Sequence, residues 1–154
     1  MIRPAVPQDI FRLAEMGEAF FKEAGFAEKL TDSDKIIFDL ESFGRTVGVL
    51  IDGAGIVLVA EKADEIIGMA AAGLAPAWWN NNVLSGQEIF FYCDPQHRRG
   101  AGRELMAGLE EAAKARGVVL FSMAAEKGLR SDALGRLYAA RGYFPIEQLY
   151  WRAL

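Results

Sequence analysis

Apolar residues recur every three or four positions in four stretches of the chain, and each stretch stops at or near a glycine. This spacing places the apolar side chains on one face of a helix, so it predicts four amphipathic helices. Asp9 stands before the first helix and Ser131 opens the last, and we expect both side chains to act as caps. The second helix is expected to open between Thr31 and Ser33. The predicted helices cover residues 10–24, 31–52, 101–116 and 131–141.

Shorter apolar runs lie between these helices and predict strands. Residues 56–61 and 66–74 flank a turn at 63–65, which predicts a hairpin, and an apolar loop from Trp78 to Leu84 is expected to lead into the next strand. The element order β-α-α-β-β-β-α-β-α-β is typical of an α/β domain with helices on both faces of one sheet. No linker or repeat divides residues 1–154, so we expect a single domain. The remaining extended segments are predicted at 2–6, 87–94, 118–124 and 143–154.

The composition is that of an ordinary globular domain, with 154 residues, 52% of them apolar and 25% charged. The only histidine, His97, leaves little basis for a catalytic triad or a histidine-rich metal site, so we expect no metal. The only cysteine, Cys93, excludes an intramolecular disulfide. It lies in an apolar run, where a buried structural thiol is expected rather than a nucleophile.

The net charge is −4, from 17 basic and 21 acidic residues. An acidic balance argues against a nucleic-acid partner and favours a cationic one. Residues 66–87 carry no charge, but Pro76 and the asparagines at 80–82 interrupt them, so the apolar part is too short to cross a membrane. The first residues lack the apolar run of a signal peptide. We therefore expect a cytoplasmic protein with no membrane partner.

The most informative stretch is CDPQHRRGAGRELM, residues 93–106, in which a predicted strand passes through a glycine loop into a helix. The first N–H groups of a helix have no partner in the helix, and the helix dipole adds positive potential, so such a turn can hold a phosphate. Gly100 and Gly102 allow a close approach of the backbone. Arg98, Arg99 and Arg103 crowd a helix end where each cation ordinarily costs about 0.3–1 kcal/mol, and a bound polyanion would reverse that cost.

Other interpretations of this loop fit less well. A solvated basic turn, with the arginines pointing away, is the structural alternative. A Walker loop requires a Gly-Lys-Ser/Thr ending that the chain lacks, and the dinucleotide fingerprint requires a glycine where Leu105 stands.

The loop resembles the pyrophosphate loop of the GNAT superfamily of N-acetyltransferases, Gln/Arg-x-x-Gly-x-Gly/Ala, which here reads HRRGAG at 97–102. The resemblance extends over the chain, from IRPAVPQDI through VLVAEKADEIIGMAA to SDALGRLYAARGY. It implies the GNAT-like acyl-CoA N-acyltransferase fold, a mixed, mostly antiparallel sheet flanked by four helices. It also implies acetyl-CoA as cosubstrate. The residues implied to bind it are Tyr92, Cys93, His97, Arg98, Arg99, Gly100, Ala101, Gly102, Arg103 and Ser131, where His97 replaces the usual Gln or Arg and Ser131 the usual Asn.

The same resemblance assigns a role to Tyr138, which lies seven residues after Ser131 and precedes Gly142 and Tyr143. In the family, the tyrosine at this position is the general acid that protonates the departing thiolate of coenzyme A. A tyrosine that only packs against its helix neighbours is the alternative.

Glu88 is the candidate general base, because an amine must lose a proton before it attacks. Alternation along residues 87–94 places Glu88, Phe90 and Tyr92 on one face, where a carboxylate between aromatic rings would suit a cation. Some family members have a glutamate near this position, and others use a water chain, so an inert surface glutamate stays an alternative. Trp78 and Trp79 are candidates for the acceptor pocket, for the core or for a dimer contact.

The expected function is acetyl transfer from acetyl-CoA to a primary amine, on a small cationic molecule, by direct attack in a ternary complex. An acyl-CoA-binding sensor without turnover is the leading alternative, and an unrelated nucleotide-binding domain is a third. The sequence leaves open both the acceptor and a homodimer.

Overall fold

The computed structural model describes residues 1–30, 37–126 and 131–152, and its centre is one mixed sheet. The strands lie in chain order, so that each pairs with the next. The first four are antiparallel, and the last is parallel to its neighbour. They are β1 (Ile2–Pro4), β2 (Gly55–Lys62), β3 (Glu65–Ala77), β4 (Asn80–Cys93) and β5 (Leu120–Ser122).

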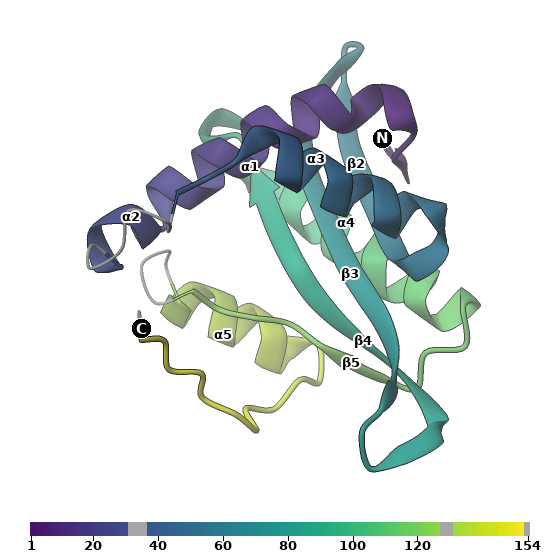
Figure 1. Cartoon of the computed structure of the whole chain (residues 1–154). Coiled ribbons are helices and arrows are strands. Elements are labelled where there is room, and N and C mark those ends of the chain that lie inside the picture. The colour runs from purple at the N-terminus through teal and green to yellow at the C-terminus, as the bar shows by residue number, and fades with distance from the viewer. Residues whose placement is uncertain (31–36, 127–130, 153–154) are drawn as a thin grey trace.

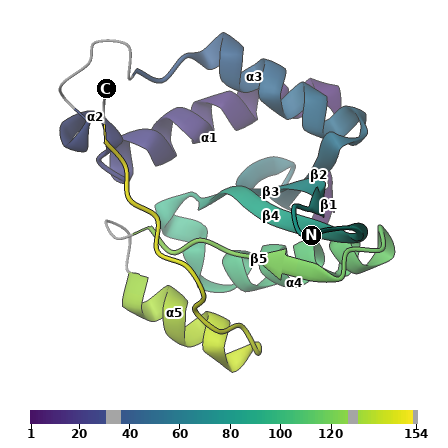
Figure 2. The same ribbon diagram turned by 60° about the horizontal axis from the view of Figure 1, so that its bottom comes forward.

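Helices cover both faces of this sheet. Helices α1 and α3 lie on one face, and α4 and α5 lie on the other (Figure 2). This layered arrangement confirms the predicted α/β fold with a mostly antiparallel sheet. The extended segment predicted to close the chain does not join that sheet, because residues 143–152 form no strand. The helices are α1 (Ile10–Glu23), α2 (Phe26–Lys29), α3 (Leu40–Val49), α4 (Arg98–Ala115) and α5 (Ser131–Ala140), with shorter turns η1 (Pro7–Asp9), η2 (Leu50–Ala54) and η3 (Pro95–His97).

The sheet separates two apolar clusters. The first joins α1 and α3 to one face, and its fully buried members include Leu13, Met16 and Met69. The second packs α4 against the other face through Leu105 and Leu109. The helix residues in both clusters are those that recur at helical spacing in the sequence. Burial of one such apolar side chain contributes about 1.5–3 kcal/mol to the free energy of unfolding.

The helix caps depart from their predictions in part. The start expected at 31–33 lies outside the described residues; residues 37–39 are not helical, and α3 begins at Leu40, where the Asp39 carboxylate accepts a 2.6 Å hydrogen bond from the Ser42 N–H. Asp9 does precede α1, but its side chain makes no cap bond. It accepts hydrogen bonds from Arg3 Nη1 at 2.7 Å and from the Val6 N–H at 2.8 Å instead. Ser131 is the first residue of α5, and the cap of that helix lies outside the described residues.

Of the two hairpins in the sheet, the first matches its prediction and the second does not. The turn between β2 and β3 is where it was expected, with positive φ at Ala63 and Asp64. The loop predicted from Trp78 to Leu84 is wrong in length, because β4 begins at Asn80 and Leu84 pairs with Pro76 of β3. Cross-strand pairing extends this uncharged segment into a long hairpin. None of the helices in the described ranges is long and apolar enough to span a membrane.

Candidate active site

The sheet opens between β4 and β5, because the pairing of these strands is short. Residues 85–87 of β4 pair with residues 120–122 of β5, and beyond them the two ribbons diverge (Figure 1). Within the described ranges, no strand faces this edge of β4 from residue 88 to residue 93. A free β edge presents backbone donors and acceptors at regular intervals, which suits an extended ligand.

A β-bulge interrupts β4 at this opening. Ala71 pairs with Phe90 and Ala72 pairs with Glu88, so Ile89 has no partner in the register. Ala71 and Ala72 are consecutive residues of β3, so their side chains point to opposite faces of the sheet. Glu88 therefore lies on the face of α4 and α5, while Phe90 lies on the face of α1 and α3.

The expectation that Glu88 shares a face with Phe90 and Tyr92 is therefore wrong. Phe90 and Tyr92 are both buried in the cluster beneath α1 and α3. A bulge adds one residue to a strand and changes the phase of its alternation, which strict period-two counting cannot register.

The carboxylate of Glu88 lies where the β4–β5 ladder stops. Its Oε2 accepts a 3.0 Å hydrogen bond from the backbone N–H of Ala124, just beyond β5. Burial raises the pKa of Glu88 to about 7, against the opposing effect of the Ala124 hydrogen bond. A carboxyl group with such a pKa exchanges its proton near neutrality, which is the property of a general base.

The hydroxyl of Tyr138 is bound to the same residue. It donates a 2.7 Å hydrogen bond to the backbone carbonyl of Ala124. Burial and the nearby charge of Glu88 raise the pKa of Tyr138, so its hydroxyl keeps its proton at neutral pH. The two predicted catalytic side chains are therefore held on the N–H and the C=O of one residue. Tyr138 lies on α5, and Ser131, the first residue of that helix, is seven positions away, or about 10 Å along the helix axis.

The glycine loop between β4 and α4 has the geometry of an anion site. Gly100 has φ +102°, and Arg99 is also non-helical, so the regular part of α4 begins at Ala101. The backbone N–H of His97 is already used, since it donates to the Asp94 carbonyl at 2.8 Å. With the regular helix beginning at Ala101, the four N–H groups without an acceptor inside it are those of residues 100–103, which all belong to the set that the resemblance implies.

The three arginines of the loop point in different directions. Arg98 turns back to Glu23 of α1, with 2.5 Å between Nη2 and Oε2. Arg99 and Arg103 are exposed, and neither has an acidic partner in the described part of the chain. Two cations thus remain beside the positive end of the helix, where a polyanion would compensate them.

Cys93 lies between β4 and the loop, and its thiol is buried. Burial raises the pKa of Cys93 to about 11, so the thiol is protonated and poorly nucleophilic. This environment favours the structural role predicted for the residue.

Trp78 and Trp79 form the end of the β3–β4 hairpin. Their side chains are 89% and 57% exposed and pack edge to face on one another. They are not in the core. Glu88 lies eight residues along β4 from its first residue, Asn80, which corresponds to about 26 Å of strand, so the structure does not bring the pair to Glu88.

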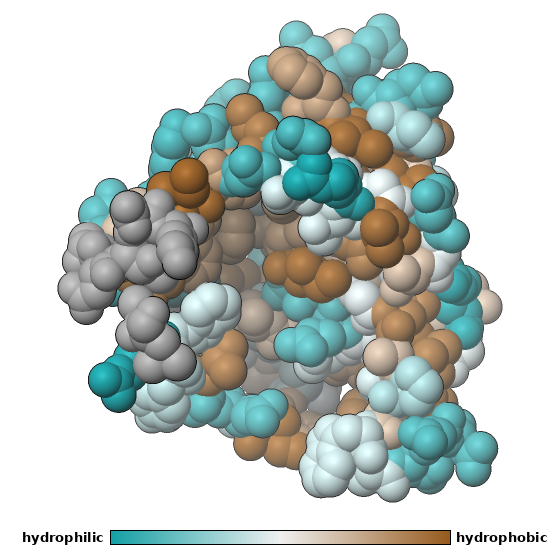
Figure 3. Space-filling view, viewed as in Figure 1, coloured by the Kyte–Doolittle hydropathy of each residue, from teal (hydrophilic) through white to brown (hydrophobic). Residues whose placement is uncertain are grey.

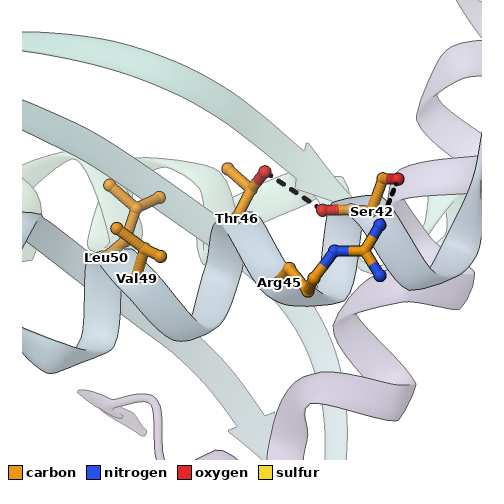
Figure 4. A pocket seen from close by; sticks show the side chains of 5 residues that line it. All are labelled: Ser42, Arg45, Thr46, Val49 and Leu50. Atoms are coloured by element: carbon orange, nitrogen blue, oxygen red, sulfur yellow. Dashed lines mark hydrogen bonds between the residues drawn. The ribbon is translucent and has the colours of Figure 1, made fainter.

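The surface is hollowed at the opening of the sheet, between the layer of α1 and α3 and helix α5, with apolar side chains deep in the hollow (Figure 3). A second hollow of about 310 Å³ lies on α3 and is lined by Ser42, Arg45, Thr46, Val49 and Leu50 (Figure 4). It holds no titratable group other than an arginine already paired with Glu41. A third hollow has a volume of about 300 Å³, and the residues that line it include His97, Arg99 and Lys62 of β2.

Two residues of this region carry no signal in the sequence. Ala124 acts through its backbone, and an alanine offers no side chain to single out. Glu23 reaches Arg98 from 75 positions away, and only the folded chain brings α1 to the loop.

A model of the acetyltransferase (GNAT) family matches residues 13–143. The match covers most of the chain, so the chain belongs to this family. Members transfer an acetyl group from acetyl-CoA, and acetyl-CoA is the cosubstrate of this chain. No curated protein matches the sequence.

Solved structures share the fold over the whole chain. A predicted acetyltransferase from Clostridium acetobutylicum, solved with acetyl-CoA, has a TM-score of 0.74 and 19% identity over 100% of this chain and 94% of its own. An aminoglycoside acetyltransferase from an uncultured soil metagenomic sample has a TM-score of 0.68 and 18% identity, over 100% and 97%. The ribosomal-protein-alanine N-acetyltransferase of Brucella melitensis has a TM-score of 0.69 and 17% identity, over 100% and 99%.

The residues present fit acetyl-CoA. The first turn of α4 and the exposed Arg99 and Arg103 are suited to the pyrophosphate, because they combine unpaired N–H groups with positive charge. The free edge of β4 is suited to the extended pantetheine arm.

Proposed function

We propose that the chain is an acetyl-CoA-dependent N-acetyltransferase that acetylates the primary amine of a small cationic molecule by direct attack in a ternary complex. One observation carries this proposal. The carboxylate of Glu88 and the hydroxyl of Tyr138 are bound to the same residue, Ala124, at the point where β4 and β5 separate. The arrangement provides a base and an acid at one opening.

Glu88 is the base in this proposal. An alkylammonium group has a pKa near 10, so almost none of it is free amine at neutral pH. Ionised Glu88 accepts the proton as the amine nitrogen approaches, and its pKa of about 7 keeps it largely ionised slightly above neutrality.

Tyr138 is the acid. Bound acetyl-CoA supplies a thioester carbonyl that an amine can attack, with formation of an N–C bond and cleavage of the C–S bond. Tyr138 gives its hydroxyl proton to the departing sulfur. The nitrogen loses its second proton to solvent after the N–C bond has formed, and Tyr138 regains a proton from solvent. Its raised pKa keeps that proton available up to the moment of transfer.

The acceptor class rests on charge. The chain has a net charge of −4, and Glu88 places a carboxylate in the opening, where a cation is attracted. The structural likeness to an aminoglycoside acetyltransferase supports a compact polyamine. The likeness to a ribosomal-protein-alanine N-acetyltransferase favours a peptide N-terminus instead, so the test must compare the two.

Release of free thiol from acetyl-CoA across a panel of acceptors tests the proposal. The panel holds aminoglycosides, short polyamines, free amino acids and peptides with an N-terminal alanine. We expect the highest kcat/KM with a di- or polycationic amine. A preference for the peptides would overturn the acceptor class, and binding of acetyl-CoA without amine-stimulated thiol release would favour a sensor.

Glu88→Gln should lower kcat/KM most near neutral pH and least at high pH. The wild-type rate should rise with pH and level off above about pH 7, as Glu88 ionises. The variant has no base and depends on amine that is already free, so its rate should keep rising toward the pKa of the amine. A variant profile parallel to that of wild type would remove Glu88 as the base.

The stability of the same variant provides an independent control. The pKa of Glu88 is raised on folding from 4.5 to about 7, so ionisation of this group does not destabilise the fold below pH 4.5 and destabilises it fully above about pH 7. Glu88→Gln should therefore raise the free energy of unfolding more at about pH 8 than at about pH 5. Equal changes at both values would show that burial does not perturb this carboxyl group.

A further inference from the structure

Helix α1 holds both ends of the segment that joins β4 to α4. At the first end, Arg12 Nη2 donates to Asp94 Oδ2 at 2.7 Å. At the second end, Arg98 Nη2 donates to Glu23 Oε2 at 2.5 Å. The two ion pairs have opposite polarity, since α1 provides the cation at Asp94 and the anion at Arg98.

Arg12 and Glu23 lie on the same side of α1. They are separated by eleven positions, which is very close to three turns of an α-helix and about 16 Å of its axis. Figure 1 shows α1 passing over the end of β4, so this side of the helix faces the segment from 94 to 98. One rigid helix therefore spans the segment and is attached at each end.

The Arg98 side chain extends this attachment to the strand. Its Nε donates to the backbone carbonyl of Cys93 at 3.1 Å, and its guanidinium carbon lies 5.6 Å from the centre of the Tyr92 ring. One guanidinium group thus joins Glu23, the last two residues of β4 and the start of α4. A lysine could not form these contacts together, because it lacks the planar fork of donors.

We propose that Glu23 and Arg12 are positioning residues for the acetyl-CoA loop. Neither is given a role toward the reacting atoms or the cosubstrate; both act through Asp94 and Arg98, which fix the backbone that enters α4. A loop fixed in its binding geometry loses less conformational freedom when the ligand binds, so the attachment increases affinity. The inference rests on the use of acetyl-CoA, and it is independent of the acceptor and of turnover.

A competing role for Glu23 predicts the opposite effect. If Glu23 only neutralised Arg98, its removal would free a third cation beside Arg99 and Arg103, and the loop would bind a polyanion more tightly. If Glu23 positions the loop, its removal should weaken binding even though a negative charge is lost. The sign of the change in affinity separates the two roles.

Calorimetric titration of Glu23→Gln with desulfo-coenzyme A tests the proposal without turnover. We expect the Kd to rise about fivefold, at the low end of ordinary coupling effects. Arg12→Gln should act in the same direction. The kcat at saturating acetyl-CoA should stay near that of wild type, and Glu23→Asp should bind with an intermediate Kd.

Glu18→Gln is the matched control, because it makes the same substitution on the same helix. Among the described residues, the ion-pair partner of Glu18 is Lys22, one turn along α1, so removal of the Glu18 charge should leave the Kd unchanged. A Kd for Glu23→Gln equal to or below that of wild type would overturn the proposal. So would an increase that Glu18→Gln reproduces. Binding of desulfo-coenzyme A by the wild type without any acetyl transfer to an amine would contradict the proposed function, and it would leave this comparison of Kd values intact.

Discussion

Gly102→Glu should abolish binding of acetyl-CoA, with a Kd at least about a hundredfold higher than that of wild type. Gly102 lies in the first regular turn of α4, where the N–H groups point toward the N-terminal end of the helix and lack an acceptor within it. A carboxylate there repels the pyrophosphate and fills the space next to those N–H groups. Thermal unfolding with excess desulfo-coenzyme A measures the effect, since a ligand at a hundred times its Kd stabilises the native state by about 2.7 kcal/mol.

Gly102→Ala is the control for steric effects. A Cβ at this position would lie 3.8 Å from Phe91 Cε1 and 4.0 Å from Cys93 Sγ, which is ordinary van der Waals contact. The alanine variant should therefore fold normally and retain most of its affinity. Wild-type binding by Gly102→Glu would show that the cosubstrate binds elsewhere.

Tyr138→Phe should lower kcat by about a hundredfold, because general acid catalysis typically contributes a factor of about 10² to 10⁴. The hydroxyl donates to the Ala124 carbonyl at 2.7 Å, and no hydrogen bond among the described residues joins it to the glycine loop. The Kd of acetyl-CoA should therefore change little. Single-turnover rates at saturating acetyl-CoA measure the loss directly.

Tyr143→Phe is the matched control for this variant. The two tyrosine rings lie 5.7 Å apart, and the Tyr143 hydroxyl donates to Glu110 at 3.0 Å, away from Glu88. Removal of this hydroxyl should affect stability more than kcat. Unchanged turnover of Tyr138→Phe with a lower Tm would make Tyr138 a packing residue.

The sequence predicts features that depend on local chemistry. The loop can be recognised in the sequence by its glycines: Gly100 has a φ of +102°, which few residue types other than glycine tolerate. The hairpin between β2 and β3 follows from apolar runs on each side of a polar turn. Helix faces are predictable for the same reason, since the period of the apolar residues is itself the signal.

Features that depend on tertiary structure are different. The bulge at Ile89 reverses the face of Glu88, and nothing in the local sequence marks it. The length of β4 comes from pairing with β3, which overrides the loop composition of the asparagines at 80–82. The contact of Glu23 with Arg98 requires the whole domain, as does the position of Tyr138 beside Ala124.

The most direct test of the account follows an isotopically labelled acetyl group from acetyl-CoA by mass spectrometry, with and without a cationic amine. We expect no acetyl-enzyme, including at Cys93, and no thiol release without amine. Label should be recovered only on the amine nitrogen, in amounts equal to the free thiol. Label on the protein that is then passed to the amine would contradict direct transfer in a ternary complex. Thiol release at the same rate without amine would contradict N-acetylation itself.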